Sequence, residues 1–275
     1  IFGSEGSIGK DLTKYLSQTY LITKIDLFKN KRKNINIDLT KKLKNNLNFS
    51  NDEFSCVIIL SFFKSQPKDF NFCNPSEFRR KNKMILNNSL KIIKKINCKK
   101  IIYFSSAAVY KNNFHSTKIN ENFPVKPLNI YSKFKFLAEK IIKKTFKNKD
   151  YQIIILRLFN IFNDKGNILI NSFKKQTRLK KKIVINGDGN QTRDFIHTND
   201  ISDLIKKIEK KKINKFEIFN LCSGNSTSIN QILKKINISQ DKIVYDKTKK
   251  TYHNLVGNPK NLKKRFNWRP KIKFL

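Results

Sequence analysis

The chain is short of several residue types, and each shortage argues against a class of protein. Its four cysteines stand apart without a CxxC pair, at Cys56, Cys73, Cys98 and Cys222. That spacing argues against a disulfide-held secreted domain and against a cysteine zinc site, so we expect no metal. No apolar run approaches the ~18 residues that span a bilayer, and no segment has the make-up of a signal peptide. We therefore expect a soluble cytoplasmic protein with no membrane partner.

Acidic residues are also scarce: 20 stand against 59 lysines and arginines, for a formal net charge of +39. Such a charge would suit a polyanionic partner. Only eight of the basic residues are arginine, however, and the other 51 are lysines spread along the chain. Glycine (8) and proline (6) are rare while lysine, asparagine, isoleucine and phenylalanine abound, the skew that A/T-rich codons produce. Nucleic-acid sites usually gather arginine on one face, so we interpret the charge as a solvated lysine surface and expect no nucleic-acid partner.

Short β-rich runs alternate with segments of helical periodicity, which favours an α/β fold with a parallel sheet and helices on both faces. The β-rich runs lie at Leu21–Leu27, Asn34–Ile37, Phe54–Ser61, Lys100–Ser105, Tyr151–Phe159 and Phe216–Cys222. The helical segments lie near Ile8–Ser17, Ser76–Ile96, Leu128–Phe146 and Asp200–Lys211. With 39% hydrophobic residues over 275 positions, the chain can bury a substantial core in one large domain or two modest ones.

A glycine-rich turn opens the chain. Gly3, Gly6 and Gly9 have a GxxGxxG spacing between a strand stub and a helix. Glycine suits this place because the backbone must turn tightly and approach a pyrophosphate, which then faces a helix amino terminus. Three glycines alone also fit an ordinary surface loop, so the motif needs support from elsewhere in the chain.

Support comes from Asp26, near the end of the β-rich run Leu21–Leu27 and 17 residues beyond Gly9. A carboxylate there accepts hydrogen bonds from an unphosphorylated ribose and repels a 2′-phosphate, which favours NAD over NADP. Three cations follow closely and keep NADP open: Lys29, Lys31 and Arg32.

Ser106, Tyr131 and Lys135 form a candidate catalytic set. Ser106 follows the buried-type run Lys100–Ser105, and Tyr131 and Lys135 share one helix face because they stand four residues apart. An ammonium at about 6 Å, at an effective dielectric of about 20, stabilises a phenolate by about 2.8 kcal/mol, or roughly two pKa units. The pair could therefore move a proton while a hydride moves to or from a nicotinamide.

Further segments follow in a characteristic order. They are Asp38-Leu39, Val57–Lys64, Asn82, Arg157–Asn160, Phe219–Gly224, Asn267–Pro270 and, most specific, Gly187–Asp200 with the sequence GDGNQTRDFIHTND. Together with the glycine turn and the Ser/Tyr/Lys set, they resemble the extended short-chain dehydrogenase/reductase family. The resemblance is to its nucleotide-sugar epimerase/dehydratase branch, and to UDP-glucose 4-epimerases most of all.

The resemblance implies a Rossmann-type doubly wound parallel sheet with a smaller carboxy-terminal substrate-binding α/β lobe, divided as 1–160 and 161–275. It implies NAD as the cofactor, held by Gly3, Gly6, Ser7, Ile8, Gly9, Asp26, Asp38, Leu39, Leu60, Lys64, Asn82 and Phe159. It implies a nucleotide-diphosphate sugar, above all a UDP-sugar, held by Asn160 and Arg193, and a homodimer formed through the two long helices. In this family the motif of His197 is structural, so we expect a packed histidine there.

The residues after Ser106 help to separate the reactions of this branch. Sugar 4,6-dehydratases carry an acidic residue just after the catalytic Ser/Thr, whereas Ala107 and Ala108 follow here. Elimination of water needs a general acid/base that this position does not offer. We therefore predict a 4-epimerase that passes through a transient 4-keto sugar, with Tyr131 as the base. A keto-sugar reductase of the same branch and a non-catalytic nucleotide- or polyanion-binding protein on the same fold remain alternatives.

Several positions depart from the family pattern. Lys111, Ser132 and Ile85 replace glycines, and a lost glycine that needed positive φ would bring a strain of order 1 kcal/mol. Phe62-Phe63 and Phe134 are bulky where smaller residues are usual beside the cofactor, so a crevice blocked by Phe62 and Phe134 would contradict the enzymatic interpretation. Leu255 aligns with the residue that gates the sugar pocket in the family's epimerases. A bulky residue at that position disfavours N-acetylated sugars as substrates.

Both ends of the chain look cut, since it begins at Ile1 without a methionine and stops in mid-pattern after Trp268. The first strand is central in this fold. We therefore expect a chain extended by a few apolar residues to be more stable and to hold NAD better.

Overall fold

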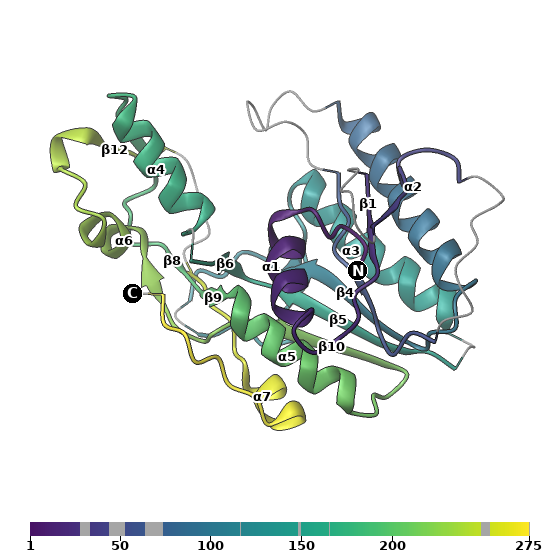
Figure 1. Ribbon diagram of the computed structural model, residues 1–275. Coiled ribbons are helices and arrows are strands. Elements are labelled where there is room, and N and C mark those ends of the chain that lie inside the picture. Colours follow the sequence, from purple (N-terminus) through teal and green to yellow (C-terminus); the bar gives the residue numbers. More distant parts are fainter. Residues whose placement is uncertain are drawn as a thin grey trace. The chain divides into compact units, whose positions relative to one another are not determined.

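The structure is a computed structural model that describes residues 1–27, 34–43, 53–63, 74–115, 117–147, 150–164, 166–248 and 254–274 (Figure 1). The chain forms two compact units, each built from three separate stretches. The first unit comprises Ile1–Ser105, Pro127–Leu156 and Ile205–Ile218, and the second comprises Ser106–Lys126, Arg157–Leu204 and Phe219–Leu275. The division expected after residue 160 stays a prediction.

The main sheet has the strand order β10-β5-β4-β3. Its strands are β3 (Val57–Ile59), β4 (Lys100–Ser106), β5 (Gln152–Leu158) and β10 (Phe216–Leu221), and β3 and β4 run parallel. A second parallel pair is formed by β1 (Lys24–Asp26) and β2 (Asn34–Asn36). Phe2 joins the two groups, because it bridges Ile25 on one side and Ile59 on the other. The predicted α/β class with a parallel sheet is confirmed.

Four helices accompany these strands: α1 (Ser7–Leu16), α2 (Pro75–Ile93), α3 (Ile130–Phe146) and the end of α5 (Thr198–Lys210). Helix α2 packs against α3, and the Lys206 ammonium of α5 lies over the Tyr15 ring of α1. In Figure 1 these two helix pairs lie on opposite sides of the strands, as a doubly wound fold requires. The core between the sheet and the pair α2 and α3 consists mainly of isoleucine, leucine and phenylalanine side chains.

Local signals explain where the two long helices begin. Asn74 caps α2 by accepting hydrogen bonds from the backbone N–H groups of Ser76 and Glu77, and Pro75 occupies the first helical position. Helix α3 begins with a capping box in which Asn129 and Ser132 satisfy each other's backbone N–H. Ser132, which replaces a family glycine, thus has a local role in starting α3.

The second unit is made of short elements around its own core. Its strands are β6 (Asn160–Phe162), β7 (Ile183–Asn186), β8 (Thr192–Arg193), β9 (Phe195–His197), β11 (Thr227–Ser228), β12 (Ile243–Asp246) and β13 (Asn254–Leu255). They pair as β6-β9, β12-β7 and β11-β8-β13. Its helices are α4 (Ile168–Arg178), α6 (Ile229–Lys235), α7 (Lys260–Phe266) and two 3-10 turns at Ala107–Val109 and Gln240–Lys242. Ile183, Phe195 and Ile232 lie in a core cluster of this unit.

The residues that replace family glycines are not strained by a positive φ angle. Among the described residues, positive φ at non-glycine positions occurs only at Lys180, Asn237 and Asn267. Lys111, Ser132 and Ile85 are described and are not among them, so their replacements do not force a left-handed backbone.

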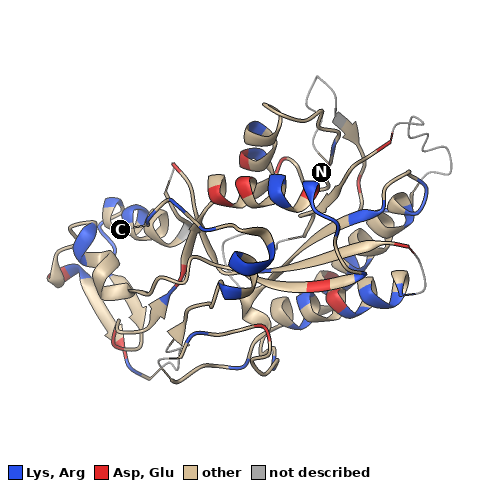
Figure 2. Cartoon of the chain, turned by 90° about the horizontal axis from the view of Figure 1, so that it is seen from below, with Lys and Arg blue, Asp and Glu red and all other residues tan. Residues whose placement is uncertain are grey.

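Figure 2 shows lysine and arginine spread over helices and loops of both units rather than gathered on one element. Within the described part of the chain, no helix has both the length and the apolar character needed to cross a membrane. Over the same residues, no three His, Cys, Asp or Glu side chains come together in a way that could hold a metal ion.

Candidate functional site

The glycine turn packs tightly against the neighbouring strand β1. Gly3 has φ +81°, and its N–H donates to the Ile25 carbonyl at 2.8 Å. A Cβ at Gly9 would lie 2.1 Å from the Gly3 carbonyl oxygen, far inside contact distance. The fold itself therefore explains both glycines: Gly3 has a left-handed backbone, and Gly9 lies too close to the Gly3 carbonyl for any side chain.

Gly6 is different. It precedes α1 as the N-cap with φ −67°, and an added Cβ there would meet only the Gly3 carbonyl oxygen, at an ordinary 3.4 Å. No side chain caps α1, and no acidic residue lies in its first turn, which Ser7 and Ile8 begin. A helix amino terminus of this kind attracts anions, and a glycine that the fold does not need leaves room for one. The turn thus fits a pyrophosphate.

Asp26 ends β1 beside this turn. Its Oδ2 accepts the Glu5 N–H at 2.8 Å, and its Oδ1 accepts the Leu27 N–H at 2.7 Å. The carboxylate therefore ties the end of β1 to the glycine turn. The predicted role on a ribose stays a prediction.

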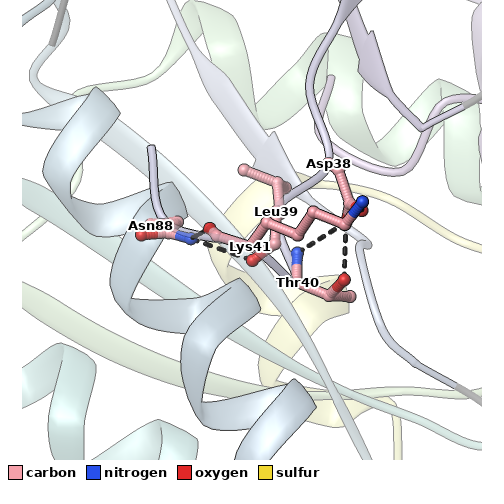
Figure 3. A network of polar contacts seen from close by, with 5 residues as sticks. All are labelled: Asp38, Leu39, Thr40, Lys41 and Asn88. Atoms are coloured by element: carbon pink, nitrogen blue, oxygen red, sulfur yellow. Dashed lines mark hydrogen bonds and ion pairs between the residues drawn. The ribbon is translucent and has the colours of Figure 1, made fainter. Parts of the chain in front are cut away.

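Asp38 and Leu39 lie in a small polar network (Figure 3). The Asp38 Oδ1 accepts hydrogen bonds from the N–H and the hydroxyl of Thr40, and Lys41 lies 3.7 Å from the carboxylate. Burial raises the pKa of Asp38, but the hydrogen bonds from Thr40 and the Lys41 charge outweigh it, so the pKa lies below its ordinary value. Asn88 of α2 donates to the carbonyls of Leu39 and Lys41, which fixes this turn against the helix.

The segment after β3 is held by Asn82. This side chain is 1% exposed, accepts the Phe63 N–H at 2.9 Å and donates to the carbonyls of Phe63 and Phe78. Leu60 donates its N–H to the Phe2 carbonyl at 2.9 Å, next to the glycine turn. Lys64, predicted to lie along the cofactor, falls outside the described residues.

Tyr131 and Lys135 are brought together on α3. Lys135 is 6% exposed, its Nζ donates to the Phe104 carbonyl at 2.8 Å, and the ammonium lies 6.0 Å from the centre of the Tyr131 ring. The ammonium thus lies beside the ring whose phenolate form it would stabilise. The neighbouring Tyr103 is a poor candidate base, because burial first, then Tyr131 and Glu139, raise its pKa well above the ordinary value.

Ser106 ends β4 at the start of the second unit. Its Oγ accepts the Ala108 N–H at 3.2 Å and so caps the 3-10 turn Ala107–Val109. Its predicted role as the third member of the catalytic set stays a prediction.

Two residues near the pair had no role in the sequence interpretation. Ser105 donates its hydroxyl to Glu139, and both are 3% exposed. Glu139 stands four residues after Lys135, so the sequence carried a signal: a carboxylate on the same helix face as the lysine. The bond ties α3 to the end of β4.

The predicted substrate residues lie close together in the second unit. Asn160 opens β6 and donates both its N–H and its side-chain amide to the Asp194 carbonyl at 3.0 Å. Arg193 ends β8 directly before Asp194, and its strand partners are Leu255 of β13 and Thr227 of β11. Phe159, predicted beside the nicotinamide, is 5% exposed, and a Cβ at Gly257 would strike its ring. The structure thus groups Asn160, Arg193 and Leu255.

Asp194 organises this group, a role that the sequence motif does not predict. Its carboxylate accepts hydrogen bonds from the N–H and hydroxyl of Ser223 and from the N–H groups of Gly224 and Gly257. Burial raises the pKa of Asp194 to about 6, and these donors oppose a further rise. The sequence indicates the importance of Asp194 only through its position inside the GDGNQTRDFIHTND motif.

His197 is a packed residue, as expected. It is 3% exposed, its Nδ1 accepts the Asn199 N–H, and its ring lies edge-on to Phe162 at 4.8 Å between centres.

Comparison with known proteins identifies relatives. The "NAD dependent epimerase/dehydratase family" matches residues 1–222. A "Putative UDP-glucose 4-epimerase" from Methanocaldococcus jannaschii is 31% identical over 151 residues, covering 53% of this chain and 48% of that protein. An ADP-L-glycero-D-manno-heptose-6-epimerase from Brachyspira hyodysenteriae is 29% identical over 263 residues, covering 86% of this chain and 79% of that protein.

Among solved structures, the UDP-N-acetylglucosamine 4-epimerase from Methanobrevibacter ruminantium M1, in complex with UDP-N-acetylmuramic acid, has a TM-score of 0.77 at 22% identity. It covers 98% of this chain, and this chain covers 91% of it. At such identity the likeness concerns the fold, and it confirms the predicted Rossmann-type architecture. The match to the first relative spans only about half of that protein's length.

Proposed function

The chain belongs to the NAD-dependent epimerase/dehydratase family, and within it we propose that the chain is a nucleotide-sugar 4-epimerase acting on a UDP-sugar. The observation that carries this proposal is the buried Lys135 ammonium 6.0 Å from the Tyr131 ring, on a helix in the same compact unit as the glycine turn. The relatives named as UDP-sugar epimerases support the choice of substrate class.

The residues of the turn are suited to the cofactor's diphosphate. NAD, the cofactor of this family, supplies a hydride acceptor that becomes a hydride donor within one turnover. The first residues of α1, next to Gly6, offer backbone N–H groups to the diphosphate, and Asp26, at the end of β1, selects an unphosphorylated ribose.

Tyr131 acts as the base in the proposed reaction. It removes the proton from the 4-hydroxyl of the hexose and returns it after the sugar has been reduced on the opposite face. The Lys135 charge stabilises the phenolate that this requires, by about 2.8 kcal/mol at about 6 Å and an effective dielectric of about 20. Ser106 holds the reacting hydroxyl through its Oγ.

The residues after Ser106 favour epimerisation over dehydration. Ala107 and Ala108 enter a 3-10 turn and are apolar, so this segment offers no carboxylate to remove a proton from carbon 5. In the second unit, Arg193 offers a planar, permanently charged fork to the diphosphate of the sugar nucleotide, beside Asn160.

The test is incubation with a panel of UDP-, dTDP- and GDP-sugars, with NMR detection of the epimers. We expect wild-type protein to interconvert one UDP-sugar with its 4-epimer without consuming added NADH. Tyr131→Phe should abolish turnover while NAD binding persists. Full activity in that variant would refute the mechanism, and a one-way reaction that consumes NAD(P)H in equal amounts would favour the reductase alternative.

A further inference from the structure

Aromatic rings surround the Lys135 ammonium. The face of Phe62 lies 4.6 Å from Nζ, and the centres of Tyr103 and Tyr131 lie at 5.1 and 6.0 Å. The Phe104 carbonyl accepts a hydrogen bond from the same Nζ. These groups leave Lys135 only 6% exposed. The ammonium that the proposed reaction depends on is thus enclosed by aromatic surface, and if Phe62, which lies against Phe134, could not move, this arrangement would contradict the enzymatic interpretation.

The distance between Phe62 and Nζ leaves no room for a ligand atom on that side. An oxygen bonded to the ammonium sits about 2.8 Å from it, and it needs about 3.5 Å to the carbons of a ring beyond it. The two together require about 6 Å, whereas the ring centre lies at 4.6 Å. A hydroxyl can therefore bond Nζ from this side only after the Phe62 ring has moved.

The surroundings of Phe62 allow its ring to move while its backbone stays in place. Asn82 holds the next residue, Phe63, through both its N–H and its carbonyl. The ring itself is half-buried at the margin of the core cluster, and besides the Lys135 ammonium it contacts three rings, edge-on to Tyr131 at 5.2 Å and to Phe78 at 5.6 Å, and tilted to Phe134 at 6.1 Å. Side-chain rotation within such a cluster exchanges one aromatic contact for another.

We propose that Phe62 is a gate on the catalytic pair, which closes over Lys135 and must swing aside before a dinucleotide can reach the ammonium. The proposal rests on the proposed function, since it takes NAD as the ligand that opens the gate. Breaking the contact between the ring and the ammonium opposes binding, so Phe62 lowers the affinity for NAD and makes binding depend on a conformational change.

Phe63 provides a matched control. It is the adjacent phenylalanine and half-buried like Phe62, and its ring also covers a lysine ammonium, that of Lys81 at 4.3 Å. Lys81 lies on α2 and is paired with Glu77, and neither has a role in the proposed reaction. A general effect of losing a phenylalanine from this segment should appear in both variants, whereas an effect on the gate should appear only at Phe62.

The experiment measures NAD affinity by calorimetry, and the rate of Lys135 acylation without ligand by peptide mass spectrometry, in wild type, Phe62→Ala and Phe63→Ala. We expect Phe62→Ala to bind NAD about tenfold more tightly and to expose Lys135 to faster acylation, with the rate of Lys135 acylation unchanged in Phe63→Ala. If Phe62→Ala proves poorly folded by circular dichroism, Phe62→Leu should shift both readouts in the same direction.

The outcomes separate the two proposals. Equal NAD affinity in all variants, or weaker binding in Phe62→Ala alone, would overturn the gate and leave the proposed function standing. Absence of NAD binding in every folded variant would remove the proposed function and the gate together. Acylation of Lys135 at the wild-type rate in Phe62→Ala would contradict the closed state itself.

Discussion

At the scale of single residues, the glycine turn separates two reasons for having glycine. Gly9 is required by packing, because its Cβ would lie 2.1 Å from the Gly3 oxygen and 2.8 Å from Ser4. Gly6 is not, because its Cβ would meet one atom at 3.4 Å. If Gly6 exists to admit a diphosphate, the two alanine variants should fail in different ways.

We predict that Gly9→Ala lowers the free energy of unfolding by about 1–3 kcal/mol or more, the cost of overpacking. Gly6→Ala should cost no more than about 1 kcal/mol, the loss of a helix N-cap glycine, yet weaken NAD binding at least tenfold. Urea unfolding and NAD titration measure the two effects. A Gly6→Ala variant that binds NAD like wild type would show that no phosphate lies against Gly6.

At the scale of elements, the first half of the fold follows the sequence pattern closely. The run Lys100–Ser105 was predicted and β4 is Lys100–Ser106, and the helix predicted at Leu128–Phe146 is α3 at Ile130–Phe146. These elements carry long apolar runs or a broad apolar face, together with strong caps, so local chemistry decides their bounds.

Apart from α5 and the end of β10, the elements of the second unit have no counterpart in the sequence pattern, and their contacts explain why. Strand β7 (Ile183–Asn186) pairs with β12 (Ile243–Asp246), which lies 60 residues further along the chain. Helices α6 and α7 have only seven residues each and are rich in lysine and asparagine. Such short polar elements are stabilised by tertiary contacts rather than by their own periodicity.

In the candidate site too, local spacing predicts some residues, whereas contacts between distant segments are not predicted. Motif spacing led to Gly6, Tyr131 and Lys135, because one turn and one helix place them. The cover of Phe62 over Lys135 could not be read from spacing, since it depends on how the segment after β3 meets α3. From the sequence, Phe62 is bulky for its place, and a crevice blocked by Phe62 and Phe134 would contradict an enzymatic role, but the contact with Lys135 is not predicted.

Asp194 links several elements of the second unit, and its pKa makes that link dependent on pH. Burial raises the pKa of Asp194 to about 6 in the folded state, against an ordinary value of about 3.9 in the unfolded chain. Because the folded state holds the proton more tightly, the stability that Asp194 contributes is largest below about pH 4. It declines as the pH rises to about 6, by up to about 3 kcal/mol.

The measurement compares urea unfolding of wild type and Asp194→Asn from pH 4 to pH 7.5. The amide cannot accept all four hydrogen bonds, so the variant should be less stable throughout. The stability difference between the two proteins should shrink as the pH rises, while other titrating groups cancel. A difference that grows between pH 4 and pH 6 would mean that the four donors overcome burial and hold the pKa below its ordinary value.

At the scale of the whole molecule, the dominant fact is the excess of positive charge. Pairs such as Lys10–Glu5 at 3.8 Å and Lys81–Glu77 at 2.7 Å do form. With 20 acidic residues for 59 cations, however, one-to-one pairing leaves 39 cations over. Their mutual repulsion opposes the compact state and is screened by salt over a Debye length of about 8 Å at 0.15 M. We therefore predict that the melting temperature rises as NaCl increases from low to moderate concentration, by about 2–4 °C for each kcal/mol of repulsion removed.

Two mechanisms could produce that rise, and they differ in which anion they need. Screening depends on ionic strength alone, whereas an anion bound at the amino terminus of α1 would make sulfate more effective than chloride at equal ionic strength. The Gly6→Ala variant decides between them, since it leaves the net charge unchanged and fills the place of a bound anion. Equal salt curves for wild type and Gly6→Ala would assign the rise to repulsion among the lysines. A sulfate effect confined to wild type would show that an anion bound at the glycine turn causes the rise in melting temperature. A melting temperature that does not change with salt would contradict both, and would mean that the lysines lie far enough apart for water alone to screen them.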